Sequence, residues 1–317
     1  MITDRIDSTT LLTDEFRNTI IPAPKAVKIE ISAKCNFNCW FCAYKDGMRP
    51  HAFMDFELYK QVLNKCYDAG IREVGLFYLG EPTLYPHLVE AIKYAKEIGF
   101  TYVFFTTNGL PITEKLMNDL IDAGLDSIKF SINSFSNEDL KESTGVGKYD
   151  KQLEILRMTR RLRDEKKSTM MIYASSIERQ TDEEQEKQEA SLINVKPYVD
   201  EHYWLPLYNQ ASFIKGRNGQ KITGGNRGRR ENLRPAMPCW ALFKTCHITY
   251  DGLMAACCFD HNNSFVMGDL KKNTFMECWN SEEFQKLRNA HLTNCVRGTA
   301  CERCLSDFLE EEDNANS

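Results

Sequence analysis

The chain has 317 residues, of which 42% are hydrophobic and 27% are charged, and its formal net charge is −5. Its length is about twice that of an average domain, which predicts two domains or one large barrel with an appendage. The composition is that of a folded globular chain and excludes a wholly disordered one. The small net charge argues against general nucleic-acid binding, and no apolar run approaches the roughly 18 residues of a membrane helix.

The twelve cysteines are the most unusual feature of the composition. Charged residues interrupt every apolar stretch of the first 25 residues, so we expect no signal peptide and a cytoplasmic location. In that reducing compartment the thiols would not form disulfides, which indicates metal binding. Their grouping predicts an N-terminal extension (1–25), a scaffold (26–207), a Gly- and Arg-rich linker or lid (208–238), a cysteine-rich domain (239–306) and an acidic tail (307–317).

The scaffold alternates strand and helix patterns. Strands are predicted over 26–31, 73–78, 101–106, 127–132, 169–174 and 202–207. The helices predicted between them cover 55–68, 86–98, 113–123, 149–166 and 182–194. Parallel strands need such helical crossovers, so the predicted fold class is α/β, a partial (β/α)6 barrel followed by a small cysteine-rich domain. The segments that directly follow the strands should then share one rim, where parallel barrels carry their working residues.

Three cysteines follow the first predicted strand, at Cys35, Cys39 and Cys42. A cubane iron–sulfur cluster has four irons and normally takes four cysteines, so three ligands leave one iron open. An open position is where metals carry out substrate chemistry, and soft thiolates disfavour magnesium and calcium. Three merely buried thiols would not account for the clustering.

This C-x-x-x-C-x-x-C loop, after the first strand of a six-unit barrel, resembles the radical S-adenosylmethionine (SAM) superfamily over about residues 25–210. The resemblance implies that Cys35, Cys39 and Cys42 bind a 4Fe–4S cluster whose open iron chelates SAM. It further implies reductive cleavage of SAM to methionine and a 5′-deoxyadenosyl radical, which removes a hydrogen from a substrate. Such an enzyme needs a reductant such as flavodoxin or ferredoxin.

The resemblance extends to the segment after the second strand. Gly80 and Glu81 match the family's Gly-Gly-Glu segment, whose acid and backbone receive the methionine amino group of SAM. Leu79 replaces the first glycine, so a backbone contact at that position does not follow. The alternative for Glu81 is a solvated acid in a turn.

Other rim positions match less specific features of the family. Thr107 and Asn108 resemble the turn that borders the SAM site, although a plain turn would look the same. Ser131 and Asn133 fall where the family contacts the SAM ribose or carboxylate. Phe41 stands where an aromatic ring packs against adenine, and it could equally shield the cluster.

The second group of cysteines resembles the SPASM/twitch extension of radical SAM enzymes, over about residues 236–306. The pattern comprises an Asp-Gly turn at 251–252, a Trp-bearing helix near Trp279 and four cysteines, at Cys239, Cys257, Cys301 and Cys304. The resemblance implies one auxiliary 4Fe–4S cluster held by these four. Two alternatives stay open: Cys246 as the first ligand in place of Cys239, and zinc, which four thiolates also suit.

These features predict a radical SAM enzyme that oxidises or epimerises a small molecule such as a sugar or aminocyclitol. Few residues precede the first strand, which leaves no room for the leader-binding domain of many peptide modifiers. A modifier of a ribosomal peptide or protein side chain is the alternative, and a non-enzymatic iron–sulfur or zinc-stabilised binding protein is the alternative of another class. Epimerisation would need a thiol hydrogen donor, for which Cys246 and Cys258 are the candidates. Neither nucleic acid nor membrane is an expected partner.

Overall fold

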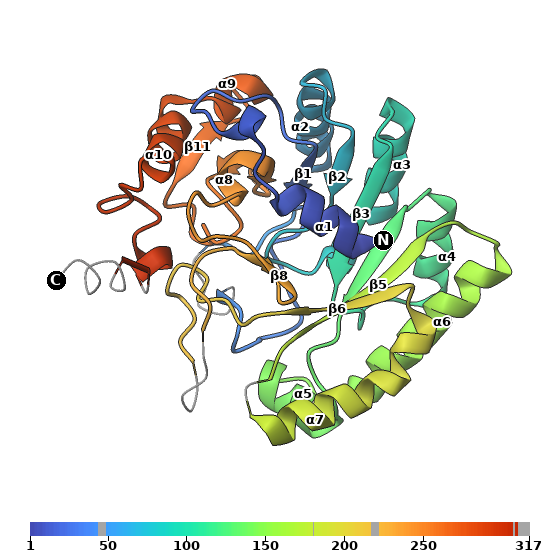
Figure 1. Cartoon of the computed structure of the whole chain (residues 1–317). Helices are drawn as coiled ribbons and strands as arrows, with labels where there is room; N and C mark the ends of the chain where they lie inside the picture. Colours follow the sequence, from blue (N-terminus) through green and yellow to red (C-terminus); the bar gives the residue numbers. More distant parts are fainter. Residues whose placement is uncertain (44–48, 180, 217–221, 307, 310–317) are drawn as a thin grey trace.

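The computed structural model describes residues 1–43, 49–179, 181–216, 222–306 and 308–309. Nine of the described strands form one sheet in the order β11-β10-β9-β1-β2-β3-β4-β5-β6, and β1 to β6 pair in parallel, as the predicted α/β barrel requires (Figure 1). The strands of this sheet are β1 (Ala26–Ile29), β2 (Glu73–Gly75), β3 (Tyr102–Thr107), β4 (Ser127–Ser131), β5 (Met171–Ile177), β6 (Glu201–Leu205), β9 (Thr245–Ile248), β10 (Leu253–Ala255) and β11 (Val266–Asp269).

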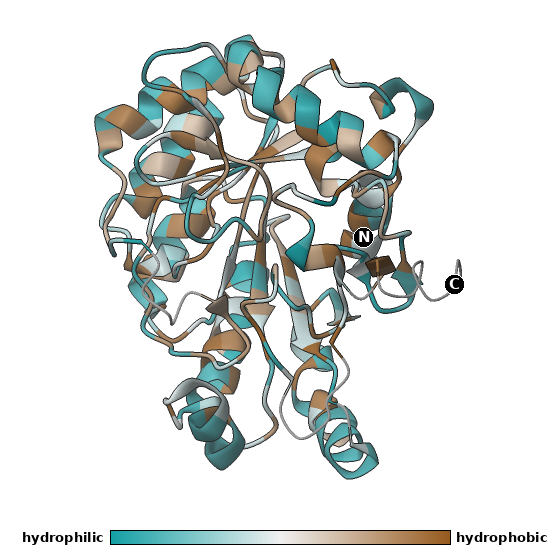
Figure 2. Cartoon of the chain, turned by 90° about the vertical axis from the view of Figure 1, so that its left-hand side faces the viewer, coloured by the Kyte–Doolittle hydropathy of each residue, from teal (hydrophilic) through white to brown (hydrophobic). Residues whose placement is uncertain are grey.

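Helices connect the parallel strands and cover the sheet, and their hydrophobic and hydrophilic bands show that they are amphipathic (Figure 2). In α2, Asp55 caps the first turn by accepting a hydrogen bond from the Leu58 amide. The helices are α1 (Ile2–Thr10), α2 (Phe56–Asp68), α3 (Leu88–Ile98), α4 (Glu114–Asp122), α5 (Asn137–Thr144), α6 (Tyr149–Glu165), α7 (Asp182–Ser191), α8 (Ala241–Lys244), α9 (Phe275–Trp279) and α10 (Glu282–Leu292).

The cysteine-rich segment continues the sheet of the barrel. Its first strand, β9, pairs in parallel with β1, and β10 and β11 follow as antiparallel neighbours. One hydrophobic core extends across both parts, from Val27 and Leu63 of the barrel to Trp279 and Phe284 of the C-terminal segment. The sequence pattern alone predicted six strands in the sheet, because the β1–β9 pairing joins segments more than 200 residues apart.

The described part of the linker contacts α1 through two of its arginines. Arg229 forms an ion pair with Asp7 of α1 at 2.7 Å, and Arg234 donates a hydrogen bond to the Asp7 carbonyl oxygen at 2.8 Å. These two arginines therefore bind the N-terminal helix. The short strands β7 (Gly228–Arg229) and β8 (Asn232–Leu233) lie in this segment. Arg217 and Lys221 of the linker, and nearly all of the acidic tail, lie outside the described residues.

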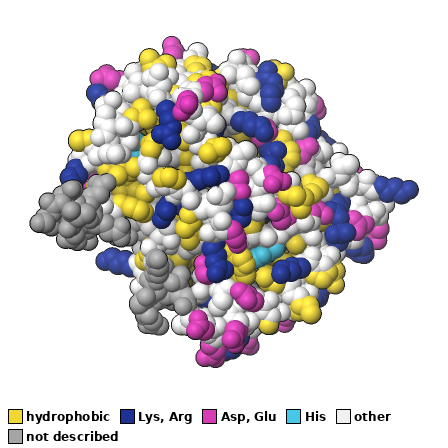
Figure 3. Space-filling view, viewed as in Figure 1, with side chains coloured by type: hydrophobic (Ala, Val, Ile, Leu, Met, Phe, Trp, Pro, Cys, Tyr) yellow, Lys and Arg dark blue, Asp and Glu magenta, His cyan; other side chains and the backbone are white. Residues whose placement is uncertain are grey.

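The surface carries mixed charge. In the view of Figure 3, acidic and basic side chains are interspersed among small hydrophobic groups. None of the helices in the described residues combines the length and the apolar character that crossing a membrane would require.

Candidate functional site

The loop after β1 carries Cys35, Cys39 and Cys42 at the carboxyl end of the strand, and the last turn of α5 supports it. The amides of Asn38 and Trp40 donate to the carbonyl oxygens of Thr144 and Ser143, at 2.9 and 3.0 Å. The sequence pattern did not predict α5, whose residues are mostly polar and whose start is marked by the Ser136 cap. This short helix fixes the position of the cysteine loop.

The three thiols of this loop suit a metal cluster. Burial raises the pKa of Cys35 to about 12 and that of Cys39 well above its usual range, and the neighbouring Cys42 raises both further. Metal binding would remove these protons, since thiolate is the form that binds metal. Three soft donors on one loop fit a cubane with one open iron.

Gly80 brings the segment after β2 against the cysteine loop. A Cβ at this position would lie 2.1 Å from the Ser32 carbonyl oxygen and 2.8 Å from that of Lys34. The next amide, of Glu81, donates to the Lys34 carbonyl oxygen at 2.8 Å. Only glycine allows this approach, because any side chain would collide with backbone atoms.

Glu81 is only 2% exposed, which excludes the interpretation as a solvated acid. Its Oε1 accepts a hydrogen bond from the Thr107 hydroxyl, and its Oε2 accepts one from the Asn108 amide, each at 2.7 Å. Burial raises the pKa of this carboxyl, whereas the hydrogen bonds lower it. Glu81 thus joins the rim loops after β2 and β3, and its contact with the SAM amino group stays a prediction.

The remaining predicted SAM-binding residues also lie on this rim. The Asn108 side chain donates to the Asn36 side-chain oxygen at 2.7 Å, which ties the turn after β3 to the cysteine loop. Phe41 and Asn133 line one small pocket, and the Asn133 side chain accepts a hydrogen bond from the Ile177 amide. Ser131 ends β4. The structure therefore gathers these residues around one face of the barrel.

The four predicted ligands of the auxiliary cluster, Cys239, Cys257, Cys301 and Cys304, line one pocket of about 40 Å³. Apolar side chains, among them Leu242, Phe259 and Leu305, complete its wall. No three His, Cys, Asp or Glu side chains of the described residues are close enough to bind one metal ion. A cubane does not need that arrangement, because each cysteine binds a different iron. The pocket therefore fits a closed, four-cysteine cluster.

The two surplus thiols differ in position. Cys246 lies on β9, is 0% exposed, and packs in the main core near Cys66 and Cys278. It reaches neither the rim nor the four-cysteine pocket, so we propose it neither as a cluster ligand nor as a hydrogen donor. Cys258 accepts a hydrogen bond from the Asn226 side chain at 3.0 Å. A hydrogen bond with Cys257 lowers the pKa of the Cys258 thiol, and the positive charge of Lys28 lowers it further.

One two-residue segment contacts both cysteine sites. The Gln210 side chain donates to the Phe41 carbonyl oxygen at 2.7 Å and accepts from the Ala43 amide at 3.2 Å. The neighbouring Asn209 donates to the Cys304 carbonyl oxygen at 3.0 Å. Gln210 has a φ of +47°, a left-handed conformation that costs about 1 kcal/mol or more in a residue with a side chain. The chain thus adopts an unfavourable turn where it joins the two sites.

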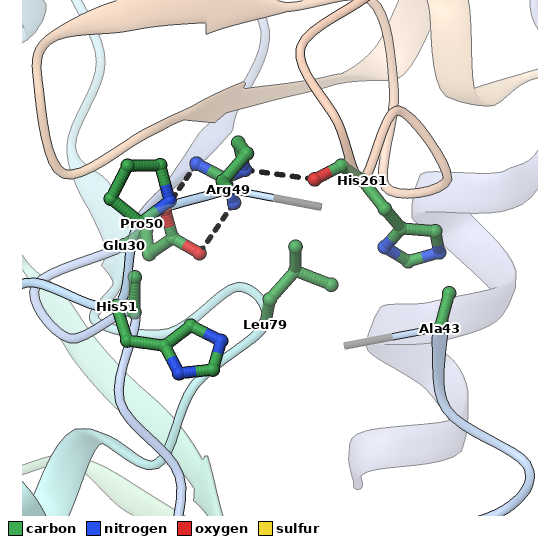
Figure 4. A pocket seen from close by; sticks show the side chains of 8 residues that line it. Glu30, Ala43, Arg49, Pro50, His51, Leu79 and His261 are labelled. Carbon is green, nitrogen blue, oxygen red and sulfur yellow. Dashed lines mark hydrogen bonds and ion pairs between the residues drawn. The ribbon is translucent and has the colours of Figure 1, made fainter. Parts of the chain in front are cut away.

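A buried ion pair braces the other end of the cysteine loop (Figure 4). The Arg49 guanidinium donates two hydrogen bonds of 2.8 Å to Glu30, which is 0% exposed, and its Nε donates to the His261 carbonyl oxygen. Burial raises the pKa of Glu30, and the charge of Arg49 opposes that rise. The pair connects β1, the cysteine loop and the C-terminal segment. No sequence motif marked Glu30 or Arg49.

A cavity of about 270 Å³ occupies the inside of the barrel. At the end of the barrel where the strands begin, the cavity is lined by residues of α1 and by the first residues of β2, β3 and β4. Helix α1 therefore covers the amino ends of the strands. Residues nearer the carboxyl ends line the rest, including Phe77, Lys129, Leu205 and Tyr208. Asn226 lines both this cavity and the four-cysteine pocket. The cavity therefore reaches from α1 to the C-terminal cysteine site.

Comparisons with known proteins agree with this architecture. Residues 29–184 match the profile of the Radical SAM superfamily, and residues 239–305 match that of SPASM, an iron–sulfur cluster-binding domain. A probable GTP 3′,8-cyclase of Saccharolobus islandicus (strain M.14.25 / Kamchatka #1) is 34% identical over 128 residues, which are 40% of this chain and 41% of that protein. The match thus spans about two fifths of the length of this curated relative.

Two solved structures share the fold. BtrN in complex with AdoMet and 2-DOIA has a TM-score of 0.57 at 16% identity, over 87% of this chain and 90% of BtrN. Streptococcus suis SuiB bound to the precursor peptide SuiA has a TM-score of 0.66 at 14% identity, over 84% of this chain and 67% of SuiB.

A parallel barrel with three thiols on its active rim, joined to a four-cysteine pocket, defines an iron–sulfur enzyme of the SAM-dependent type. The chain belongs to the radical SAM superfamily and carries a C-terminal SPASM domain. These two domains imply SAM and 4Fe–4S clusters as its cofactors.

Proposed function

We propose that this enzyme removes a hydrogen atom from a small molecule, such as a sugar or aminocyclitol, held inside the barrel. The observation that carries the proposal is the cavity of about 270 Å³ below the cysteine rim. Pockets for drug-sized molecules usually measure about 300–1,000 Å³, and this cavity lies just below that range, so it suits a smaller ligand of sugar size. Because α1 covers its lower end, a peptide would have to enter from the rim.

Cys35, Cys39 and Cys42 would hold the SAM-binding cluster, and the C-terminal pocket would hold the auxiliary one. When bound, these groups supply the one-electron cleavage of SAM and an acceptor for an electron that leaves the substrate. The chain itself contributes the rim loops joined by Glu81 and the barrel wall that lines the cavity. A small reductant such as flavodoxin or ferredoxin would deliver the electron.

The names of similar proteins are consistent with a small substrate without fixing it. GTP is a nucleotide, and BtrN was solved with 2-DOIA as well as AdoMet. SuiB was solved with a precursor peptide, so modification of a peptide is the competing outcome.

Anaerobic reconstitution of the full chain tests the proposal. With a strong reductant, we expect cleavage of SAM to 5′-deoxyadenosine, and iron analysis should give about eight irons per chain for two cubanes. Four irons and one zinc would assign zinc to the C-terminal pocket. A reconstituted protein that cannot cleave SAM would contradict the enzyme and favour a binding protein.

Oxidation is the outcome we propose for the substrate, because a closed auxiliary cluster is a ready electron acceptor. Cys258 interacts with Asn226 and Lys28, two residues of the cavity wall, and this favours epimerisation as a second candidate. Turnover in deuterium oxide separates the two. Oxidation predicts a product two hydrogens poorer, whereas deuterium at an inverted carbon, lost in Cys258→Ala, would establish epimerisation.

A further inference from the structure

We infer that Lys28 and Lys129 form an anion-binding site inside the barrel, which holds a carboxylate or phosphate of the substrate. This inference rests on the proposed function and narrows its substrate class. Lys28 lies on β1 between the buried Val27 and Ile29, and Lys129 lies on β4. Since side chains alternate along a strand, the pattern directs both lysines away from the outer core, and both line the cavity.

Neither ammonium is neutralised by the part of the chain that the structure describes. Glu73, the acid that lines the cavity, already pairs with Lys25 at 3.0 Å and with Arg5. Burial lowers the pKa of Lys28, and the positive charge of Lys129 lowers it further, against an opposing effect of Cys258. Two partly buried cations that repel each other are costly for a protein to keep, and an anion bound by both would relieve that cost.

The groups around the lysines suit a molecule that has a charged end and a polar body. The Lys129 ammonium donates to the Tyr203 hydroxyl at 3.2 Å, and the Lys28 ammonium lies 5.5 Å from the centre of the Phe77 ring. Asn226 and Tyr208 add neutral polar side chains to the same cavity wall; the Asn226 side-chain amide donates to Cys258 and the Tyr208 hydroxyl donates to the Gly228 carbonyl oxygen. Lysines bind carboxylates and phosphates as point charges, so the shared ligand chemistry is a compact anion.

The test compares three sugars of similar size that differ in charge. Glucose 6-phosphate, glucuronate and glucose are titrated calorimetrically into the anaerobically reconstituted full chain at low ionic strength. We expect at least one of the two anionic sugars to bind ten-fold or more tightly than glucose. A preference for glucose 6-phosphate identifies a phosphate as the ligand group, and a preference for glucuronate identifies a carboxylate.

Variants then assign the binding to the lysines. Lys28→Met and Lys129→Met should each weaken the binding of the preferred sugar at least ten-fold, without lowering the thermal midpoint, because each removes a partly buried charge that has no acidic partner among the described residues. Lys93→Met makes the same charge change at an exposed position of α3 and should leave binding unchanged. Equal binding of all three sugars, or unchanged binding in both cavity variants, would overturn the inference.

SAM cleavage by the unmodified chain is measured in parallel, which separates this inference from the proposed function. A chain that binds the anion through the two lysines but does not cleave SAM would retain the anion site and refute the proposed enzyme activity.

Discussion

In the N-terminal loop, three cysteines lie within eight residues of one turn, whereas the four cysteines of the C-terminal pocket are spread over residues 239–304. Hydrogen bonds from other loops hold the first set, chiefly through α5, Gly80 and Gln210. The second set meets because β9 and β10 add to the sheet beside β1. The first site thus depends on its rim contacts, and the second depends on the tertiary fold.

This difference explains why three and four cysteines serve different purposes. A short loop with three cysteines would leave one iron of the cluster without a protein ligand, which is what SAM binding requires. A pocket walled by four cysteines and apolar side chains would close its cluster against exchange. The segment at Asn209 and Gln210 contacts both sites, so we expect a structural change in one site to alter the structure of the other.

The largest expected effect comes from removing the first set. Replacing Cys35, Cys39 and Cys42 together by alanine should abolish SAM cleavage and lower the iron content from about eight to about four per chain. The barrel should stay folded, because its stability comes from apolar burial along the sheet and not from this loop. Iron analysis, circular dichroism and detection of 5′-deoxyadenosine measure the three quantities. Retained cleavage would show that the catalytic cluster lies elsewhere.

A second large effect is expected at the brace between the sites. Arg49→Met leaves the Glu30 carboxylate buried without its partner, which typically costs about 3–5 kcal/mol. We expect a matching loss in the free energy of unfolding, measured by urea denaturation, and poorer assembly of the cluster at Cys35–Cys42. The double variant Arg49→Met with Glu30→Gln should recover much of that loss, since it removes the stranded charge. No recovery would mean that the ion pair is not the source of the cost.

The fold was more predictable than the contacts that complete the site. Strand and helix periodicity in residues 26–207 predicted the parallel barrel, because each unit forms from adjacent sequence. The spacing of Cys35, Cys39 and Cys42 predicted the cluster loop for the same reason. Lys28 and Arg49 escaped notice because an isolated charge in a strand or loop carries no local signal. Their importance arises only when folding brings β9 beside β1 and places β4 in the same barrel.

The extent of Glu81 burial was likewise invisible in the sequence. A Gly-Glu-Pro turn looks exposed when it is considered alone, yet Thr107 and Asn108 of the next rim loop enclose the carboxylate. The four-cysteine pocket was predicted through a family resemblance and not from spacing, and only the structure shows that Cys239 lines it while Cys246 does not.

A moderate effect is expected where one segment joins the two sites. Gln210→Ala removes both hydrogen bonds to the cysteine loop, and losing buried partners of this kind costs about 1–3 kcal/mol. We expect slower SAM cleavage and an altered electron paramagnetic resonance signal of the N-terminal cluster, with iron content retained. Gln185→Ala, at a solvent-exposed hydrogen bond on α7, provides the control and should change neither property. An unchanged spectrum in Gln210→Ala would show that this residue does not couple the two sites.

The smallest effect should come from Cys246, and it tests which thiols belong to the second site. Because Cys246 is fully buried in the core, Cys246→Ala should lower the free energy of unfolding by about 1–2 kcal/mol through the small cavity it leaves. It should not change iron content, since its side chain packs near Cys66 and Cys278 and does not line the pocket. Cys239→Ala, seven residues earlier, should instead deplete the auxiliary cluster. The reverse result, with iron lost only in Cys246→Ala, would require β9 to leave the sheet when the cluster binds.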